Sequence, residues 1–216
     1  MKFLIKLIEE KPEIKKTGTT TVGLICKDGV VLAAEKKSTM GYLVASKESK
    51  KILPIADHIV LTIAGASGDA QTLARYMRAE VKIFEIQNKR RISVKGAATL
   101  LANILQSSKF YPYYVQLIIA GYDFTGPKIF DLDAIGGTEE EKKFFSTGSG
   151  SPIALGVLED GYKDNLSIED GKRLALRAIK AAIERDIGSG GKAIDVCVIT
   201  KEGINIERQE LEKLKR

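Results

Sequence analysis

The order of the predicted elements indicates an α+β fold, a four-layer α-β-β-α sandwich of two mainly antiparallel sheets. Strand-like segments are followed by two helical segments, more strands, two more helices and a last pair of strands. The helical segments carry apolar stripes at helical spacing, so each pair can cover one sheet. With 216 residues, 44% of them hydrophobic and 29% charged, the chain can form one large domain with a full core. The pattern contains no linker and no internal repeat.

The first two strands are predicted at residues 19–27 and 30–37. Asp28-Gly29 stands between them and is a hairpin turn signal. A three-residue loop with Gly29 in the left-handed conformation would pair Gly23 with Glu35. A two-residue loop would instead put Glu35 on the opposite face, because side chains alternate along a strand.

The remaining strands are predicted from apolar and β-branched runs that are bounded by turn residues. They lie at Lys50–Pro54, His58–Ala64, Val115–Tyr122, Lys128–Asp133, Phe144–Ser146, Ala193–Thr200 and Ile204–Arg208. The charged tail from Gln209 is expected to fray or to contact other subunits.

Four helices are predicted, each with its own start signal. Gly65–Asp69 breaks a strand pattern and opens a helix with the apolar stripe Ala70, Leu73, Ala74, Met77, Val81 and Phe84. Ser93 can cap the second helix, and Pro152 suits the first turn of a short third helix that ends near Gly161. Ser167 begins a capping box for the fourth helix, with Asp170 in place of Glu.

Charge and hydropathy exclude two classes of partner. The formal net charge is +6, and residues 1–18 hold five Lys and three Glu, so +4 remains without them. Basic and acidic residues are interleaved, and no basic stripe carries aromatic residues, so nucleic acid is not an expected partner. No apolar run approaches the ~18–20 residues that span a membrane, so no membrane partner is expected either.

The N-terminal segment and the cysteines favour a cytoplasmic location. Residues 2–8 look like the apolar part of a signal peptide, but Lys6 interrupts them and no small-residue cleavage site follows. A short amphipathic lead or propeptide fits better. Cys26 and Cys197 each lie inside an apolar strand-like run, which predicts buried free thiols and no disulfide framework.

Gly18 is followed by Thr19, Thr20 and Thr21 at the head of an apolar run. Taken alone, such a run is a good strand start, because β-branched residues suit a pleated surface. The alternative is that the Gly18–Thr19 bond is cut, which would give Thr19 a hydroxyl nucleophile and a free α-amine. An α-amine has an ordinary pKa of about 7.7–8.0 and can act as a base near neutral pH, whereas a lysine amine at about 10.4 would need a large shift.

Lys51 and Glu35 could support such a nucleophile. Lys51 lies in an apolar strand, where its amine could reach solvent or could be buried near Thr19 and favour proton loss from the hydroxyl. Glu35 could be a solvated strand end, or a carboxylate that holds Lys51 charged and oriented.

Asp186 is predicted on the apolar stripe of the fourth helix, four residues past Ala182. A carboxylate near a helix C-terminus opposes the helix dipole, and one that faces the core needs hydrogen-bond donors. Ser189, in the loop that follows, is a candidate donor. The alternative is a surface ion pair with Arg185 or Arg177.

The two Ser- and Gly-rich loops do not match the motifs that they suggest. Residues 147–151 and 188–192 lack the spacing of a phosphate-binding loop, and the first also lacks the Gly-x-Ser-x-Gly order of a hydrolase elbow. His58 is the only histidine and is expected to be structural. No Ser-His-Asp triad and no zinc ligand cluster is therefore available, and neither a metal nor a cofactor is expected.

These features together resemble a proteasome β subunit of the archaeal or bacterial core particle, over nearly all of the chain after residue 18. The resemblance rests on Gly18-Thr19-Thr20-Thr21-Val22-Gly23, Glu35, Lys50-Lys51, Ile63-Ala64-Gly65, Gly68-Asp69-Ala70, Ala134-Ile135-Gly136-Gly137, Ser146-Thr147-Gly148-Ser149-Gly150-Ser151-Pro152, Arg185-Asp186 and Ser189-Gly190-Gly191. It implies an N-terminal nucleophile hydrolase fold. Residues 1–18 would be a propeptide removed by autolysis, and residues 19–216 would be a single catalytic domain.

The resemblance also implies a role for each candidate residue. Thr19 would be the nucleophile, its amine the base, and Lys51 the group that lowers the pKa of the hydroxyl. The Gly65 amide would stabilise the oxyanion. The supporting residues would be Glu35, which orients Lys51, and Ser149, Asp186 and Ser189, which hold the amine.

For substrate, the resemblance implies capture of an unfolded polypeptide as an added strand along the backbone of Thr39 and Gly65. The side-chain pocket would include Ser38, Ser49, Leu53, Ile63 and Ser67. It has no obvious acidic or basic floor, so cleavage after apolar residues is expected. The implied partners are other β subunits in a heptameric ring, α subunits in flanking rings and, indirectly, a regulatory ATPase.

Three alternatives are less consistent with the sequence. The simpler bacterial two-ring threonine peptidase is shorter and usually lacks a long propeptide. A non-catalytic α subunit would lack Thr19, Lys51, Asp186 and Ser189. A nucleotide-binding module is disfavoured by the loop spacings.

Overall fold

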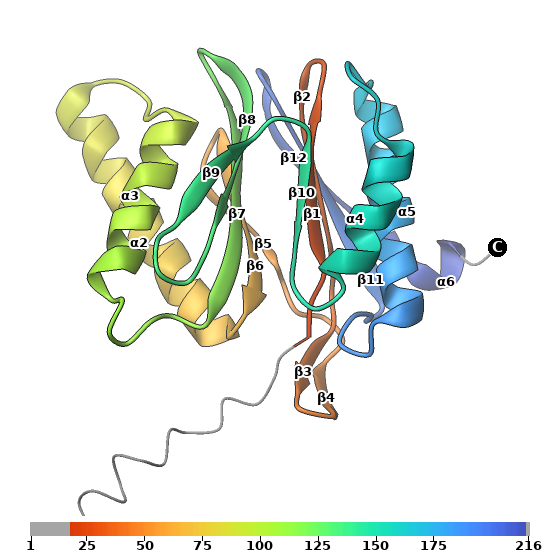
Figure 1. The fold of residues 1–216 in the computed structure, drawn as a ribbon. Helices are drawn as coiled ribbons and strands as arrows, with labels where there is room; N and C mark the ends of the chain where they lie inside the picture. The colour runs from red at the N-terminus through yellow and green to blue at the C-terminus, as the bar shows by residue number, and fades with distance from the viewer. Residues whose placement is uncertain (1–17, 215–216) are drawn as a thin grey trace, which may run out of the picture.

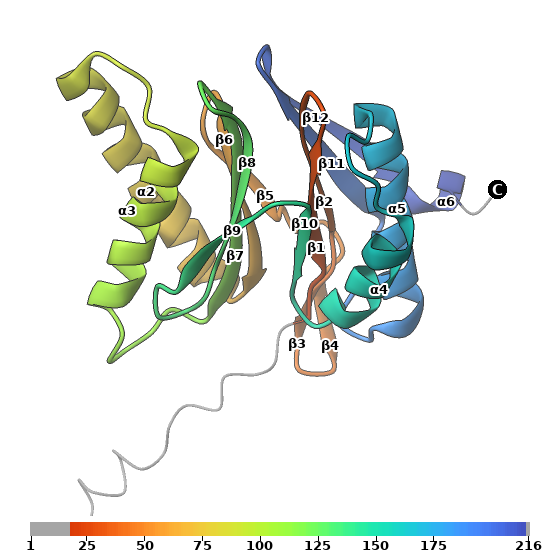
Figure 2. The same ribbon diagram turned by 45° about the horizontal axis from the view of Figure 1, so that its top comes forward.

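The computed structural model describes residues 18–214 as two antiparallel sheets that face each other, each with helices on its outer face (Figure 1). The same layers are visible after rotation (Figure 2). The predicted four-layer α-β-β-α sandwich is therefore confirmed. The predicted propeptide, residues 1–18, lies outside the described residues except for Gly18.

The first sheet carries the start of the described chain. It has five strands in the order β10-β1-β2-β11-β12, all antiparallel. Its strands are β10 (Phe144–Thr147), β1 (Thr21–Cys26), β2 (Gly29–Glu35), β11 (Ala193–Thr200) and β12 (Gly203–Glu210). Helices α4 (Ser151–Gly161) and α5 (Ile168–Arg185) cover its outer face (Figure 1).

The second sheet also has five strands, in the order β5-β6-β7-β8-β9. Its strands are β5 (Ile52–Ala56), β6 (Ile59–Gly65), β7 (Val115–Asp123), β8 (Gly126–Leu132) and β9 (Thr138–Glu141). Helices α2 (Ser67–Asn88) and α3 (Val94–Ser107) cover its outer face (Figure 1). Strand β9 was not predicted from the sequence.

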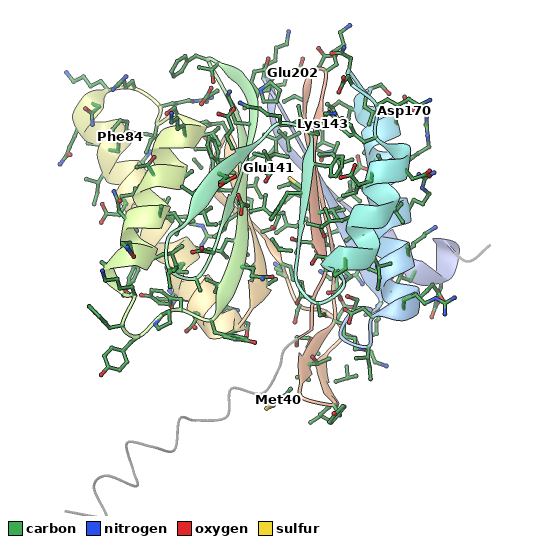
Figure 3. All side chains as sticks on the ribbon, viewed as in Figure 1. Met40, Phe84, Glu141, Lys143, Asp170 and Glu202 are labelled. Carbon is green, nitrogen blue, oxygen red and sulfur yellow. The ribbon has the colours of Figure 1, made fainter. Side chains whose placement is uncertain are left out.

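A two-stranded ribbon, β3 (Ser38–Met40) and β4 (Leu43–Ser46), was also not predicted. It projects from the end of the sandwich at which β1 begins, with Met40 on an exposed side (Figures 1 and 3). At the other chain end, the prediction that the tail frays from Gln209 is wrong as far as Leu214. There β12 runs to Glu210, and α6 (Leu211–Leu214) follows it.

Side chains fill the space between the two sheets and the space beneath each pair of helices (Figure 3). Strand β2 shows why. Val30, Leu32 and Ala34 pack between the sheets, whereas Val31 and Ala33 pack under α4 and α5. Every residue of β2 is buried, because both faces of the strand are covered.

The predicted helix signals are confirmed. Ser93 caps α3 by accepting a hydrogen bond from the Gly96 N–H at 3.0 Å. Ser167 caps α5 by accepting one from the Asp170 N–H at 3.1 Å. Pro152 lies in the first turn of α4, which ends at Gly161.

The predicted register of the first hairpin is wrong. Cys26 pairs with Gly29 and Gly23 pairs with Leu32, so the loop has two residues, Lys27 and Asp28. Gly29 does not have a positive φ. Instead, a Cβ on Gly29 would lie 2.3 Å from the carbonyl oxygen of Ile199 in the neighbouring strand β11. Gly29 therefore serves close strand packing and not the turn.

The two cysteines are buried free thiols, as predicted. Burial raises the pKa of Cys26 and of Cys197 to about 12. Both thiols are therefore protonated near neutral pH and belong to the apolar core.

Because Gly29 lies so close to the backbone of β11, we expect a methyl group added at this position to lower the stability of the fold. Gly29→Ala would force a Cβ against the β11 backbone, and we expect a loss of about 1–3 kcal/mol in the free energy of unfolding, measured by urea denaturation. Gly156→Ala in α4 is the matched control, because nothing lies within 4 Å of its added Cβ. That variant should gain about 0.5–1 kcal/mol. Equal stability of the two variants would contradict the explanation.

Candidate active site

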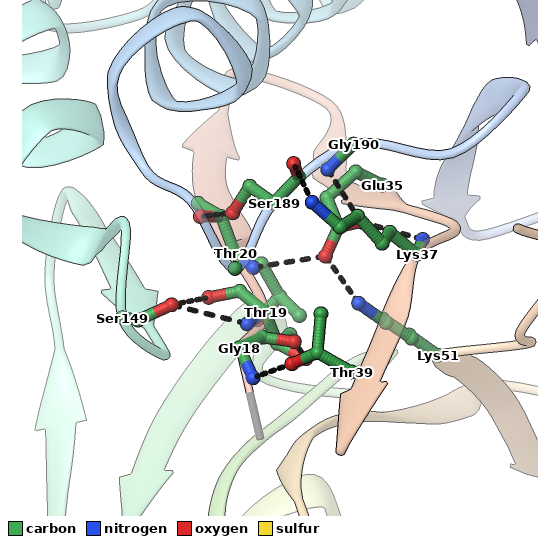
Figure 4. Close-up of polar contacts among 12 residues, drawn as sticks. Gly18, Thr19, Thr20, Glu35, Lys37, Thr39, Lys51, Ser149, Ser189 and Gly190 are labelled. Atoms are coloured by element: carbon green, nitrogen blue, oxygen red, sulfur yellow. Dashed lines mark hydrogen bonds and ion pairs between the residues drawn. The ribbon is translucent and has the colours of Figure 1, made fainter. Parts of the chain in front are cut away.

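Thr19 lies two residues before the start of β1 and is 4% exposed. It is joined to Gly18 by a peptide bond, and its hydroxyl donates to the Gly18 carbonyl oxygen at 2.7 Å. The Gly18 N–H donates to Thr39 Oγ1 at 2.8 Å, so β3 holds the bond from the other side (Figure 4). The hydroxyl of Thr19 therefore lies next to the carbonyl group of the bond that precedes it.

Two glycine-containing loops enclose Thr19 by close backbone packing. A Cβ on Gly18 would lie 2.0 Å from the Cα of Gly188. Gly148 has φ +94°, and a Cβ there would lie 2.1 Å from the carbonyl oxygen of Thr19. The Ser- and Gly-rich loops around these glycines thus wrap the chain at Thr19, which explains their composition without a bound phosphate.

Lys51 and Glu35 form a buried ion pair beside Thr19 (Figure 4). Lys51 is 4% exposed and Glu35 is fully buried. The two-residue turn places Glu35 on the face of β2 opposite to the one predicted. The pair still forms, because Glu35 is the last residue of β2 and Lys51 directly precedes β5, so the side chains meet at the ends of the two sheets.

The Glu35 carboxylate has a partner for each oxygen. Oε1 accepts from the Thr20 N–H at 3.2 Å as well as from Lys51, and Oε2 accepts from the N–H groups of Lys37 at 2.7 Å and Gly190 at 3.0 Å. A buried charge is tolerated when it is paired and hydrogen-bonded in this way. Glu35 therefore fixes the relative positions of four segments of the chain.

Burial and charge act in opposite directions on this pair. Burial lowers the pKa of the Lys51 ammonium, while the charges of Glu35 and Asp186 favour its protonated form. Burial raises the pKa of the Glu35 carboxyl, and Lys51 and the two N–H donors oppose that rise. Each charge therefore depends on the other.

Asp186 does not lie on the apolar stripe of the helix, as was predicted. It is the C-cap of α5, one residue past the helix end, with extended backbone angles. Its Oδ2 accepts from the hydroxyls of Ser149 and Ser189, each at 2.6 Å, and its Oδ1 accepts from the Gly188 N–H at 3.1 Å. The predicted donor, Ser189, is present.

The surface ion pair that was considered for Asp186 is not found among the described residues. Arg177 instead lies 3.8 Å from Asp160. The carboxylate of Asp186 instead accepts hydrogen bonds from two hydroxyls and a backbone amide, all in the two loops that enclose Thr19.

These hydroxyls form a chain with a defined direction. Ser149 and Ser189 each use their single proton for Asp186, so Ser149 Oγ accepts from the Thr19 N–H at 3.2 Å and Ser189 Oγ accepts from Thr20 Oγ1 at 2.6 Å. The backbone nitrogen of Thr19 contacts Ser149 (Figure 4), and the Ser149 hydroxyl connects it to Asp186.

Several residues at the site were not singled out from the sequence. Thr20 contacts both Glu35 and Ser189. The Lys37 ammonium donates to the Ile187 carbonyl oxygen at 2.7 Å and supports the loop after α5. The threonine run was a usable signal for Thr20, whereas the contact of Lys37 is with backbone and leaves no mark in the sequence.

Thr19 lines a pocket of about 310 Å³. Most of the predicted substrate residues line the same pocket, namely Ser38, Thr39, Ser49, Ile63, Gly65 and Ser67, together with Lys51. Leu53 is not among the lining residues and packs against the core under α2 and α3. The lining also includes Met40 and Ala45 from the ribbon and the exposed Lys50. Among residues 18–214, no carboxylate lines the pocket.

Comparison with known proteins identifies the family. A model of the proteasome subunit family matches residues 15–199. The chain belongs to the proteasome subunit family. Among its relatives, a protein of Methanocaldococcus fervens named proteasome subunit beta is 54% identical over 199 residues, which cover 91% of this chain and 88% of the relative.

Two further relatives of this proteasome-family chain carry the same name. The protein of Methanocaldococcus vulcanius is 53% identical, with 91% of this chain and 89% of the relative covered. That of Archaeoglobus profundus is 52% identical, with 91% and 92% covered. The resemblance found in the sequence is thus confirmed at the level of the family, which implies a protease.

Two features are absent from residues 18–214 of this proteasome subunit. No helix among them is long and apolar enough to cross a membrane. No group of three or more His, Cys, Asp or Glu side chains among residues 18–214 is arranged to hold a metal ion.

The buried ion pair predicts a large effect on stability. Glu35→Gln would leave the Lys51 ammonium buried without an anion, and we expect the free energy of unfolding to fall by about 3–5 kcal/mol. Glu140→Gln is the matched control, because its partners Lys128 and Lys142 are partly or largely exposed. Its cost should stay within about 1 kcal/mol.

A second substitution tests the same pair from the other side. Adding Lys51→Met to Glu35→Gln should recover part of the lost stability in urea denaturation, because the unpaired charge is removed. If the double variant were less stable than Glu35→Gln by the full cost of a separate Lys51→Met substitution, the two residues would not be coupled.

Proposed function

We propose that this chain is a catalytic β-type subunit of the proteasome core particle and acts as a threonine endopeptidase. Residues 1–18 are a propeptide, and residues 19–216 form the catalytic domain. The name that its relatives carry favours a β subunit over an α subunit. The observation that carries the proposal is the chain of hydrogen bonds from the Thr19 nitrogen through Ser149 to Asp186, next to the buried Lys51–Glu35 pair.

The contact between the Thr19 hydroxyl and the Gly18 carbonyl supports autolysis. The hydroxyl oxygen adds to the Gly18 carbonyl carbon, its proton passes to the Thr19 nitrogen, and the C–N bond breaks to leave an ester and a free amine. Water then cleaves the ester and releases Gly18 as a carboxylate. Water is the only other reactant that the balance needs, and Thr19 is left with both its hydroxyl and its α-amine.

The same groups serve peptide hydrolysis after the cut. The freed amine takes the proton of the Thr19 hydroxyl, because its ordinary pKa of about 7.7–8.0 leaves much of it neutral near pH 8. Ser149 accepts a hydrogen bond from this nitrogen and donates one to Asp186, so Asp186 orients the nitrogen through Ser149. The charge of Lys51, held by Glu35, favours the alkoxide of Thr19.

The substrate is an unfolded polypeptide that adds as a strand along Thr39 and Gly65, with the Gly65 N–H at the oxyanion. The lining of the pocket contains Ile63, Met40 and Ala45 and no carboxylate, which fits a preference for apolar residues before the cut. The partners are other copies in a heptameric ring, α subunits in flanking rings and, indirectly, a regulatory ATPase, in the cytoplasm.

Mass spectrometry of the intact protein tests the proposal. Wild-type chain should lose residues 1–18 and begin at Thr19. Thr19→Ala should keep them and should not hydrolyse peptides, because no hydroxyl remains to form the ester. Thr19→Ser is the matched control, since it keeps a hydroxyl at the same position and should still be processed. Removal of residues 1–18 from purified Thr19→Ala would refute autolysis.

A further inference from the structure

The last residue of β6, Gly65, is held against the chain segment that precedes β7. Gly65 has φ +110°, and a Cβ there would lie 2.2 Å from the carbonyl oxygen of Tyr114. The next N–H, that of Ala66, donates to the same carbonyl oxygen at 2.8 Å. The conformation of Gly65 therefore depends on where the backbone of Tyr114 lies.

The side chain of Asp69 holds the backbone of Tyr114 in place. The Tyr114 N–H donates to Oδ2 of Asp69 at 2.8 Å. Asp69 is the third residue of α2, so the bond connects the first turn of the helix to the peptide group that Gly65 packs against. Gly65 and Ala66 line the pocket that Thr19 lines, and Tyr114 and Asp69 hold them from outside its lining.

We propose that Asp69 is a positioning residue for peptide hydrolysis, which holds Tyr114 and through it the Gly65 N–H that faces the oxyanion. This inference rests on the proposed function. Its physical basis is that an oxyanion donor must lie within a few tenths of an ångström of its working distance, and removal of such a donor costs about 10²–10³ in kcat. Asp69 touches neither Thr19 nor the substrate and acts only through the backbone.

The surroundings explain why Tyr114 needs this anchor. It ends a loop in which Phe110 and Tyr111 are 83% and 92% exposed, so these two side chains do not anchor the loop, and Tyr113 alone packs against the core under α2 and α3. If Asp69 were lost, the Tyr114 N–H would have no partner in the described structure. Gly65 would then be held only by the end of the β6–β7 ladder, where it pairs with Val115. A shift of the backbone is possible at this position because glycine has no Cβ to restrict it.

A purely structural role must be separated from positioning. A carboxylate in the first turn of α2 also stabilises the helix dipole, so any loss of Asp69 costs some stability. Asp69→Asn distinguishes the two, because it removes the charge but keeps an oxygen that can accept from Tyr114. Asp123→Ala is the matched control, since Asp123 accepts from the Val94 N–H at 2.8 Å at the start of α3, the other helix of the same layer.

The experiment measures kcat and KM for a fluorogenic peptide on assembled particles that contain this chain. Each variant is made with Thr19 already exposed by removal of a fused ubiquitin, so that processing does not confuse the result. We expect Asp69→Ala to lower kcat about tenfold with KM within about twofold, and Asp69→Asn to stay near wild type. Asp123→Ala should leave kcat unchanged and lower the thermal unfolding midpoint about as much as Asp69→Ala.

A transition-state analogue gives an independent measure. A peptide aldehyde forms a tetrahedral adduct with a hydroxyl and should bind Asp69→Ala more weakly by the same factor as the loss in kcat/KM, whereas a non-cleavable peptide amide should bind both proteins equally. If Asp69→Ala does not assemble, Asp69→Glu, which lengthens the arm, carries the same expectation of a lower kcat.

Three results would overturn the inference: unchanged kcat in Asp69→Ala, an equal loss in Asp69→Asn, or a change confined to KM. None of these affects the proposed function, which fails instead if wild-type particles do not hydrolyse the peptide or if Thr19→Ala particles do.

Discussion

The buried ion pair of Glu35 and Lys51 is the interaction on which the surroundings of Thr19 depend. Glu35 ends a strand of one sheet and Lys51 directly precedes a strand of the other, so the pair connects the two sheets at the end where the described chain begins. The remaining lone pairs of Glu35 hold the backbone at Thr20, Lys37 and Gly190. A carboxylate buried this deeply is stable only with all of these partners, so the segments around Thr19 are fixed together.

The rest of the sandwich provides a rigid base for that pair. Strand β2 is buried on both faces, and its neighbours β1 and β11 are bonded along its whole length. Behind Thr19, Thr21 shares hydrogen bonds with Thr147 at 2.7 Å and with Thr62 of the facing sheet at 3.0 Å. Polar contacts thus join the sheets near the site, while apolar layers join them elsewhere.

Local signals in the sequence were sufficient for α2, α3, α4 and α5 but not for α6. Tertiary contacts decided most of what the sequence did not predict. Ser93, Pro152 and Ser167 act within one turn of chain, so their roles could be predicted. Gly29 was assigned to a turn. Glycine is needed at this position because Ile199, in a strand about 170 residues later in the sequence, approaches its backbone too closely for a side chain. The β3–β4 ribbon escaped prediction because its residues are mostly exposed and show no alternation to detect.

The candidate site was predictable to the extent that it consists of unusual side chains. Thr19, Lys51 and Asp186 stand out because a nucleophile, a buried cation and a carboxylate at a helix end each need an explanation. Ser149 entered only through the resemblance to a family, because a serine in a Gly-rich loop has many possible roles. Asp69 shows the remaining limit, since its partner is a backbone N–H and backbone groups do not vary with sequence.

The contacts around Gly18 connect the two reactions that are proposed for this chain. Gly18 lines the same pocket as Thr19. Only glycine fits at this position, because the backbone of Gly188 leaves no room for a side chain. Removal of residues 1–18 would therefore open space directly beside the Thr19 nitrogen, where Thr39 Oγ1 has lost its donor. An incoming peptide could place an N–H of its own on Thr39, so the propeptide and a substrate would use the same hydrogen-bond acceptor in turn. On this view the site cannot bind a substrate before it has cut itself, because one group occupies the position that the other needs.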